Sequence, residues 1–325
     1  MSGKKMATLQ LIRRALSITL SIFLVLGCSS AFLQKNNASQ TPPMDILVST
    51  QWLSTHLDDP QLVVLDSTVI VKMDAKSGMS NISGLEQYLQ GHIPHARFAD
   101  LKGALSNHDS SLDFVMPTPE QFAAAIGELG IDNQSKVVIY TTGNHVWATR
   151  LWWMLRWAGL EQVAVLDGGY NAWITEGRAV STLPVSFTPK QFNLMLKPEL
   201  IAARNEVFHA ITDPKIHIVD ALPPASYSGQ YAMYARPGHI PTASNVPSSE
   251  LVTETGRYKS FDELDMMQNS DRNQRVITYC GGGVAASGTA FTLHRLGFKD
   301  VAVYMGSLQE WANDPENPMT TDEKD

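Results

Sequence analysis

The sequence has little cysteine and no excess of positive charge. Two cysteines occur in 325 residues, and the formal net charge is −7. A protein that binds nucleic acid needs a basic face, so this charge argues against nucleic acid as a partner. The rest of the composition, 44% hydrophobic and 18% charged, is that of a soluble globular protein long enough for two domains.

The uncharged run near the N-terminus, residues 15–28, is too short to span a bilayer comfortably. It has the length of the apolar region of a signal peptide and follows the basic residues Lys4, Lys5, Arg13 and Arg14. It ends in Leu-Gly-Cys28, which resembles a bacterial lipobox, where cleavage leaves a lipidated cysteine as the new N-terminus. The sequence therefore predicts a lipoprotein signal peptide over residues 1–28, with Cys28 as the lipidation site. A transmembrane anchor or an ordinary signal peptide is the alternative.

This signal would place the protein in the bacterial cell envelope, anchored by lipid and facing the periplasm. Ser29 stands where an aspartate would favour the inner membrane, so we expect the outer membrane. Residues 29–44 are polar and proline-containing, as in a tether. Structural cysteines in an oxidising compartment usually occur in disulfide pairs. If Cys28 carries lipid, Cys280 has no partner, so it is either a buried structural residue or a reactive thiol.

Short apolar runs alternate with segments of helical spacing along the rest of the chain. Residues 62–65, 136–140 and 163–166 are typical of strands buried on both faces. Residues 119–129 and 147–158 have the apolar spacing of helices. This alternation predicts an α/β protein with central parallel sheets flanked by helices.

The same motifs occur twice in the same order, with offsets between about 138 and 154 residues. The segment Gly91–Ala96 (GHIPHA) recurs as Gly238–Ala243 (GHIPTA), and Val137–Tyr140 recurs as Val276–Tyr279. We therefore predict two tandem copies of one domain. Their expected bounds are 45–178 for domain 1, 179–198 for a linker and 199–325 for domain 2.

The two copies differ at a loop that follows a predicted strand. Aligning Tyr140 with Tyr279 puts Thr141 opposite Cys280, so domain 1 is expected to be catalytically silent. Cys280 is followed by three glycines and leads into a helix that begins near Ala285. Such a loop lies at the carboxyl end of a parallel sheet, where its N–H groups and the helix dipole stabilise a thiolate or a persulfide. The alternative is a buried structural cysteine, although three glycines would then be costly without any packing gain.

The loop also lacks an arginine, and this excludes one kind of cysteine chemistry. A phosphate-cleaving cysteine enzyme needs an arginine about six positions after the cysteine to hold the phosphoryl oxygens. Residues 284–287 read Val-Ala-Ala-Ser. Sulfur transfer needs only a nucleophile, an N–H cradle and a group that attracts the anionic donor. The predicted substrate-binding residues are accordingly Gly281, Gly282, Gly283, Val284 and Ala285.

The doubled GHIP motif, the single loop cysteine and Asp66 and Asp220 after apolar strands together resemble the tandem-domain rhodaneses. These are the thiosulfate and 3-mercaptopyruvate sulfurtransferases, and the resemblance covers about residues 46–311. It implies two similar α/β domains and an active site in the second. Cys280 would take sulfur from a donor, become a persulfide and pass the sulfur to cyanide or a thiol. No metal or organic cofactor is implied.

The chain departs from this family at Ser226, where an arginine usually stands six residues after the Asp220 position. We expect Arg236 to attract the anionic donor instead, with a solvated loop charge as the alternative. Asp220 is expected to support the site by holding backbone groups. Because this arginine is missing, a second hypothesis stays open, in which the chain is a non-catalytic sulfur carrier or a binding or sensing module for a protein partner. The donor stays open between thiosulfate and 3-mercaptopyruvate.

Two further groups of residues are expected to be structural. His92 and His239 precede Ile-Pro in matching turns, and only one of the two copies has the thiol. The tryptophans of the helix predicted over 147–158 are expected in the core and at the interface between the domains: Trp147, Trp152, Trp153 and Trp157.

Overall fold

The computed structural model describes residues 44–74, 78–267 and 271–322. The predicted signal peptide, Cys28 and nearly all of the tether lie outside the described residues. Within the described residues, no helix is both long and apolar enough to cross a membrane.

The first half of the chain is built on a parallel sheet with strand order β1-β7-β6-β2-β5. In β2, the four residues from Val63 to Asp66 are all buried, as expected for a strand covered on both faces. β6 and β7 have the predicted bounds. The strands are β1 (Leu47–Val48), β2 (Leu62–Asp66), β5 (Arg97–Phe98), β6 (Lys136–Tyr140) and β7 (Val163–Leu166).

The second half repeats this sheet. Its strand order is β10-β9-β11-β12-β8, which is the first order read from the other edge, and all its pairs are parallel. The strands are β8 (Ile201–Ala202), β9 (Ile216–Asp220), β10 (Ser244–Asn245), β11 (Arg275–Tyr279) and β12 (Asp300–Tyr304). The predicted α/β class and the tandem duplication are both confirmed.

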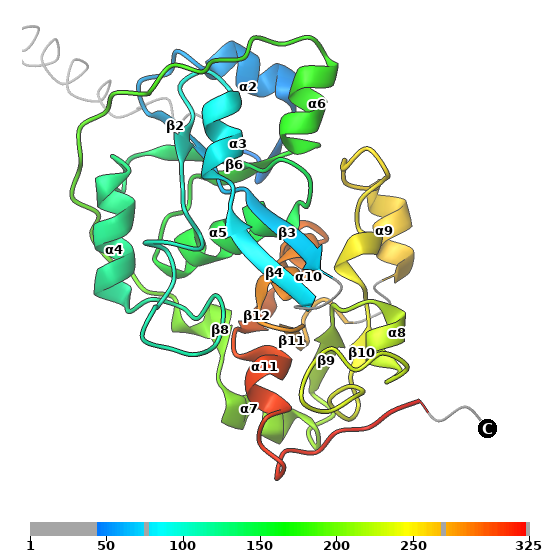
Figure 1. Ribbon diagram of the computed structural model, residues 1–325. Helices are drawn as coiled ribbons and strands as arrows, with labels where there is room; N and C mark the ends of the chain where they lie inside the picture. Colours follow the sequence, from blue (N-terminus) through cyan, green and yellow to red (C-terminus); the bar gives the residue numbers. More distant parts are fainter. Residues whose placement is uncertain (1–43, 75–77, 268–270, 323–325) are drawn as a thin grey trace, which may run out of the picture. The chain divides into compact units, whose positions relative to one another are not determined.

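Helices connect the strands in each half (Figure 1). Helix α4 begins with a capping box in which Thr118 and Gln121 satisfy each other's backbone N–H groups. The first half has α2 (Thr50–His56), α3 (Leu85–Gln90), α4 (Pro119–Glu128), α5 (Val146–Trp157) and α6 (Gly169–Thr175). The second half has α7 (Arg204–Ala210), α8 (Pro224–Tyr227), α9 (Phe261–Met267), α10 (Val284–Arg295) and α11 (Ser307–Trp311). Two short 3₁₀ helices cover Pro198–Leu200 and Ser248–Glu250.

The first half contains an antiparallel hairpin that has no counterpart in the described part of the second half. It consists of β3 (Val69–Asp74) and β4 (Gly78–Ser83) and follows directly after β2. The sequence analysis did not predict it. The β-branched run Val69-Ile70-Val71 was the available signal, since such residues favour strands.

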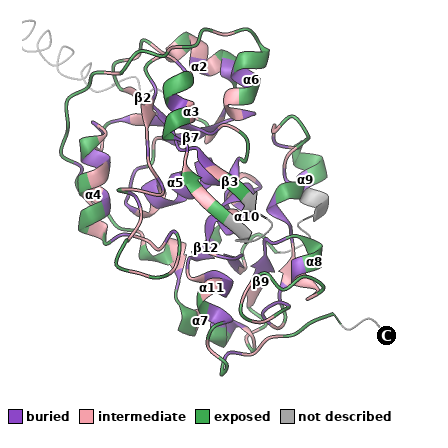
Figure 2. Ribbon diagram, viewed as in Figure 1, coloured by how far each residue is buried: buried purple, intermediate pink, exposed green. Residues whose placement is uncertain are grey.

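The two halves meet along α5 and α10, and Figure 2 shows that α5 is mostly buried. The Trp152 ring packs edge-on against Phe291, with ring centroids 4.9 Å apart. Trp147, Trp152 and Trp153 are at most 5% exposed, and Trp157 is partly buried against the same core. The tryptophans therefore belong to the core and to the contact between the halves, as the sequence predicts.

The histidines of the two GHIP turns have structural contacts in both copies. The Nδ1 atom of His92 lies 2.9 Å from the carbonyl oxygen of Tyr88, and that of His239 lies 2.8 Å from the carbonyl oxygen of Tyr227. Each imidazole also stacks on the ring of the same tyrosine. The turns are thus held identically in both halves.

The segment between the two sheets packs against the first half. The Lys190 N–H donates to the Gly127 carbonyl at 2.9 Å, and the Lys197 N–H donates to the Trp157 carbonyl at 2.8 Å. Phe192, between them, is buried. The segment is therefore fixed along its course on the surface of the first half.

Candidate functional site

Cys280 follows β11 at the carboxyl end of the second sheet and is 2% exposed. Its loop ends at Gly283, which has φ +76° and caps α10. The left-handed conformation explains the glycine at this position, because a side chain would be strained there. Helix α10 begins at Val284, so its N-terminus adjoins the cysteine loop as predicted.

Ser307, at the start of α11, forms hydrogen bonds with the cysteine loop. Its Oγ accepts the N–H groups of Cys280 at 3.1 Å and of Gly283 at 3.0 Å, and it donates to the Tyr304 carbonyl at 2.7 Å. The Leu308 N–H donates to the Cys280 carbonyl at 3.0 Å. These bonds fix both ends of the loop to the turn after β12.

The N–H groups of Cys280 and Gly283 are thus taken by Ser307 and cannot face an anion, so one of the five predicted binding residues, Gly283, does not supply a donor. In the described part of the chain, the N–H groups of Gly281, Gly282, Val284 and Ala285 have no such acceptor. The predicted cradle is therefore smaller than expected. It consists of the first two loop glycines and the first turn of α10.

Each of the three glycines faces a different neighbouring side chain. A Cβ atom on Gly281 would lie 1.5 Å from the hydroxyl oxygen of Tyr234. One on Gly282 would lie 3.0 Å from Nε2 of Gln309, and one on Gly283 would lie 2.8 Å from a terminal guanidinium nitrogen of Arg150. The glycines therefore make room for Tyr234, Gln309 and Arg150 as well as letting the backbone turn.

Tyr234 lies over the cysteine loop, on the segment between α8 and β10. Burial raises the pKa of its phenol, and the negative charges of Cys280 and Asp220 raise it further. The hydroxyl therefore keeps its proton at neutral pH. It is available as a hydrogen-bond donor beside Gly281.

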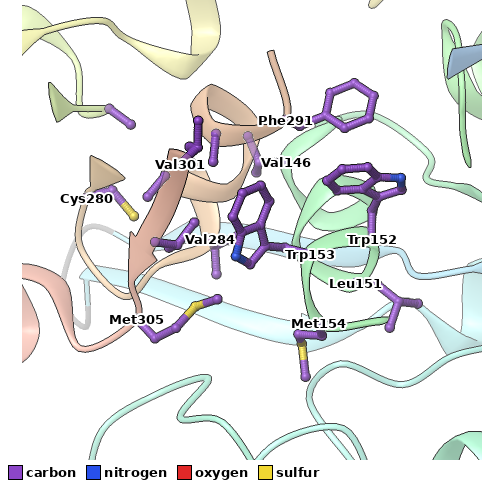
Figure 3. Packing of buried hydrophobic residues seen from close by; sticks show 14 of the residues in the cluster. Val146, Leu151, Trp152, Trp153, Met154, Cys280, Val284, Phe291, Val301 and Met305 are labelled. Atoms are coloured by element: carbon purple, nitrogen blue, oxygen red, sulfur yellow. The ribbon is translucent and has the colours of Figure 1, made fainter. Parts of the chain in front are cut away.

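Arg150 comes from α5 in the first half and is 1% exposed. One terminal nitrogen donates to the sulfur of Met305 and the other donates to the Phe114 carbonyl at 2.7 Å. Burial lowers the pKa of this guanidinium to about 10, and the Cys280 thiolate opposes that shift. Figure 3 shows Cys280, Val284 and Met305 beside α5 residues such as Val146 and Trp153.

Asp220 ends β9 and is fully buried. Its Oδ1 accepts the Leu222 N–H at 2.7 Å, which is the backbone-holding contact expected of it. Burial raises the pKa of this carboxyl to about 6, although the Leu222 N–H acts in the opposite direction.

The structure corrects the expectation for Arg236. All three nitrogens of its guanidinium donate to main-chain carbonyls, those of Trp311, Ala312, Asp314 and Asn317. These bonds hold the segment after α11 in place. The side chain is occupied by this structural task, and the geometry does not support its binding the donor.

Sequence reasoning missed Ser307, Tyr234 and Arg150. Ser307 had a detectable signal, because it stands where the first copy has Gly169, and both positions are left-handed, at φ +49° and +56°. Tyr234 and Arg150 had none, because their contacts with the loop depend on the tertiary packing. Among the described residues, no group of three His, Cys, Asp or Glu residues could hold a metal ion.

Comparison with known proteins agrees with the duplicated fold. A family model described as "Rhodanese-like domain" matches residues 49–176 and 204–314. The 3-mercaptopyruvate sulfurtransferase of Escherichia coli strain K12 is 34% identical over 278 residues, which cover 84% of this chain and 96% of that protein. The thiosulfate sulfurtransferase of Gallus gallus is 32% identical over 233 residues, which cover 70% of this chain and 80% of that protein.

A solved structure agrees with the same assignment. The crystal structure of SseA from Escherichia coli, described as a 3-mercaptopyruvate sulfotransferase with the rhodanese fold, superposes with a TM-score of 0.72. The identity is 34%, and the match covers 81% of this chain and 99% of that one. The chain therefore belongs to the rhodanese family, in the form with two rhodanese-like domains in tandem.

Proposed function

We propose that this chain is a sulfurtransferase. It moves sulfur from a small anionic donor, thiosulfate or 3-mercaptopyruvate, to cyanide or a thiol through a persulfide on Cys280. The observation that carries the proposal is the setting of Cys280. The thiol lies at the N-terminus of α10 on a loop fixed by Ser307, and the equivalent loop of the first half has Thr141 instead. The names of the relatives support the same reaction class.

The reaction has two steps at one sulfur atom. The Cys280 thiolate attacks the outer sulfur of thiosulfate, the S–S bond of the donor breaks, and sulfite leaves with the bonding electrons. With 3-mercaptopyruvate the broken bond is C–S, and the leaving pyruvate enolate takes up a proton. The Cys280 persulfide anion then gives its outer sulfur to cyanide, which becomes thiocyanate, and the thiolate is restored.

The neighbouring groups suit this cycle because each intermediate is an anion. The free N–H groups of Gly281, Gly282, Val284 and Ala285 stabilise the thiolate and its one-sulfur-longer persulfide. The Tyr234 hydroxyl supplies a further donor beside Gly281. No proton transfer by Cys280 is needed in the thiosulfate route, so the site requires positioning and charge stabilisation more than acid–base catalysis.

Intact mass spectrometry tests this proposal. We expect the purified full-length protein in detergent to gain one sulfur atom from thiosulfate or 3-mercaptopyruvate and to lose it when cyanide is added. Cys280→Ser should gain none, whereas the matched control Cys28→Ser should gain sulfur as the wild type does. If neither donor loads a thiol that still reacts with an alkylating agent, the small-donor reaction is wrong.

A second candidate function is sulfur carriage for a protein partner. It is favoured by Ser226, a buried serine where tandem rhodaneses usually carry an arginine. A carrier would be loaded by a partner's persulfide and would turn over small donors poorly. Loading from a protein persulfide, with no loading from either small donor, would identify this function.

We also propose that the protein is a lipoprotein of the bacterial cell envelope, anchored through Cys28 and facing the periplasm, in the outer membrane. The basic start, the uncharged run over 15–28 and the Leu-Gly-Cys28 ending support this location. Metabolic labelling with a radioactive fatty acid should mark the wild type and leave Cys28→Ser unlabelled. Label on Cys28→Ser, or none on the wild type, would contradict it.

A further inference from the structure

Arg150 is a buried cation whose described contacts leave it without an anionic group other than Cys280. Its two hydrogen-bond partners, the Phe114 carbonyl and the Met305 sulfur, are neutral. A negative charge on Cys280 would act on this guanidinium and raise its pKa. Burying an unpaired positive charge costs free energy. An anion formed at Cys280 would compensate the charge of Arg150, and this explains why the guanidinium is buried here.

The duplication within the chain shows that an arginine is placed only against the loop that carries Cys280. Helices α5 and α10 both have 12 residues, and their alignment pairs Arg150 with Gly288. Arg150 faces Gly283, the N-cap of α10, while a Cβ on Gly288 would lie 3.4 Å from Nε2 of His145, the N-cap of α5. Each helix therefore presents the same position to the other half's loop. Arg150, which faces the Cys280 loop, carries a positive charge. Gly288, which faces the equivalent loop of the first half, has no side chain.

We propose that Arg150, supplied by the silent first domain, is the positioning residue that stabilises the thiolate and persulfide of Cys280. This inference deepens the proposed function and rests on it. The site in the second domain is then incomplete without the first domain. Arg150 supplies the positive charge that Ser226 and Arg236 do not.

The contacts of Arg150 explain how it acts through the loop. Its guanidinium lies against Gly283 and against Met305, which directly follows β12, so it contacts both segments that Ser307 ties together. Its charge favours the anionic form of the sulfur, and its packing keeps the loop closed on the N-terminus of α10. Lysine would keep the charge without the fork of donors, and methionine would keep much of the bulk without the charge.

The test compares Arg150→Lys and Arg150→Met with the wild type by the rate at which Cys280 is alkylated. Iodoacetamide is neutral, so its rate of reaction reports how much of Cys280 is thiolate. Iodoacetate is an anion, so its rate of reaction also depends on the positive charge near Cys280. At pH 7 we expect Arg150→Met to slow alkylation by iodoacetamide about tenfold, and alkylation by iodoacetate more strongly still. Arg150→Lys should recover most of both rates. Arg150→Gln, which keeps a donor for the Phe114 carbonyl, replaces Arg150→Met if that variant does not fold.

Arg156→Met is the matched control, because it removes another arginine, a partly buried one, from the same helix α5. Arg156 pairs with Glu161 and packs on Trp152, and its variant should alkylate at the wild-type rate. If folded Arg150→Met alkylates like Arg156→Met with both reagents, Arg150 is merely structural and the inference is wrong. Alkylation requires no sulfur donor, so this failure is distinct from a failure of wild-type protein to accept sulfur, which would count against the proposed function.

Discussion

Asp66 and Asp220 end the equivalent strands β2 and β9, and both are buried without an ion pair in the described part of the chain. Burial raises the pKa of both carboxyls. Each also accepts the N–H of the residue two positions later, Thr68 and Leu222 respectively. At the residue scale these carboxylates therefore hold the turn after each strand, and they do so at a cost in stability when they are ionised.

Asp220→Asn should change how stability depends on pH. The folded-state pKa of Asp220 is about 6, against an ordinary value of 3.8. Because the folded state holds the proton more tightly, the wild type should lose stability as the pH rises from about 4 to about 6. Asparagine has no such titration, so the free energy of unfolding of Asp220→Asn relative to wild type should rise over this range, by at most about 3 kcal/mol. Urea unfolding at several pH values measures the difference, and a difference that does not vary with pH would contradict the prediction.

Helices α6 and α11 begin at equivalent points but with different residues. Gly169 and Ser307 both have positive φ, a conformation that is strained only for the serine. The next N–H in each half donates to the loop carbonyl, from Tyr170 to Thr141 at 2.9 Å and from Leu308 to Cys280 at 3.0 Å. At the scale of elements, the added feature in the second half is therefore the Ser307 hydroxyl beneath the cysteine loop.

Ser307→Ala and Ser307→Gly separate the hydroxyl from the backbone strain. Both remove the acceptor for the Cys280 and Gly283 N–H groups, so both should slow sulfur transfer to cyanide, by about tenfold. Only glycine also relieves the strain, so Ser307→Gly should be more stable than Ser307→Ala by about 1 kcal/mol. Steady-state rates and thermal unfolding measure the two effects. A full transfer rate in both variants would show that the hydroxyl does not hold the loop in its reactive form.

The elements that could be predicted from the sequence are those with a strong local signal. The runs 136–140 and 163–166 are strands with the expected bounds, since buried parallel strands are continuously apolar. The β3–β4 hairpin was missed because it is an insertion into the repeat. Arg236 was misassigned because its proximity in sequence to the GHIP motif says nothing of the carbonyls it meets in the C-terminal segment. Arg150 is remote in sequence from Cys280, and only the packing of α5 on α10 brings the two together.

At the scale of the whole molecule, one hydrophobic core runs through both halves. It includes Trp152 and Leu151 of α5 together with Phe291 and Leu293 of α10. Arg257 adds a charged link, since its guanidinium meets Asp167 at 3.2 Å and also pairs with Glu176. A partly exposed link of this kind is worth little alone, so the shared core must provide most of the coupling between the halves.

This coupling predicts that residues 44–325 unfold in one step. Six of the seven tryptophans precede residue 200, so tryptophan fluorescence reports mainly the first half, and the reaction of Cys280 with a thiol reagent reports the second. Both probes should give the same denaturation midpoint. Phe291→Ala should lower the free energy of unfolding by about 3–5 kcal/mol as seen by both probes, because it removes a buried ring that packs on Trp152 across the halves. The control Phe208→Ala, at a 52% exposed position on α7, should have a much smaller effect. Separate midpoints for the two probes would mean that the halves fold independently. The second half could then be folded while the first half is unfolded, and Arg150 would not be held against the cysteine loop in that state.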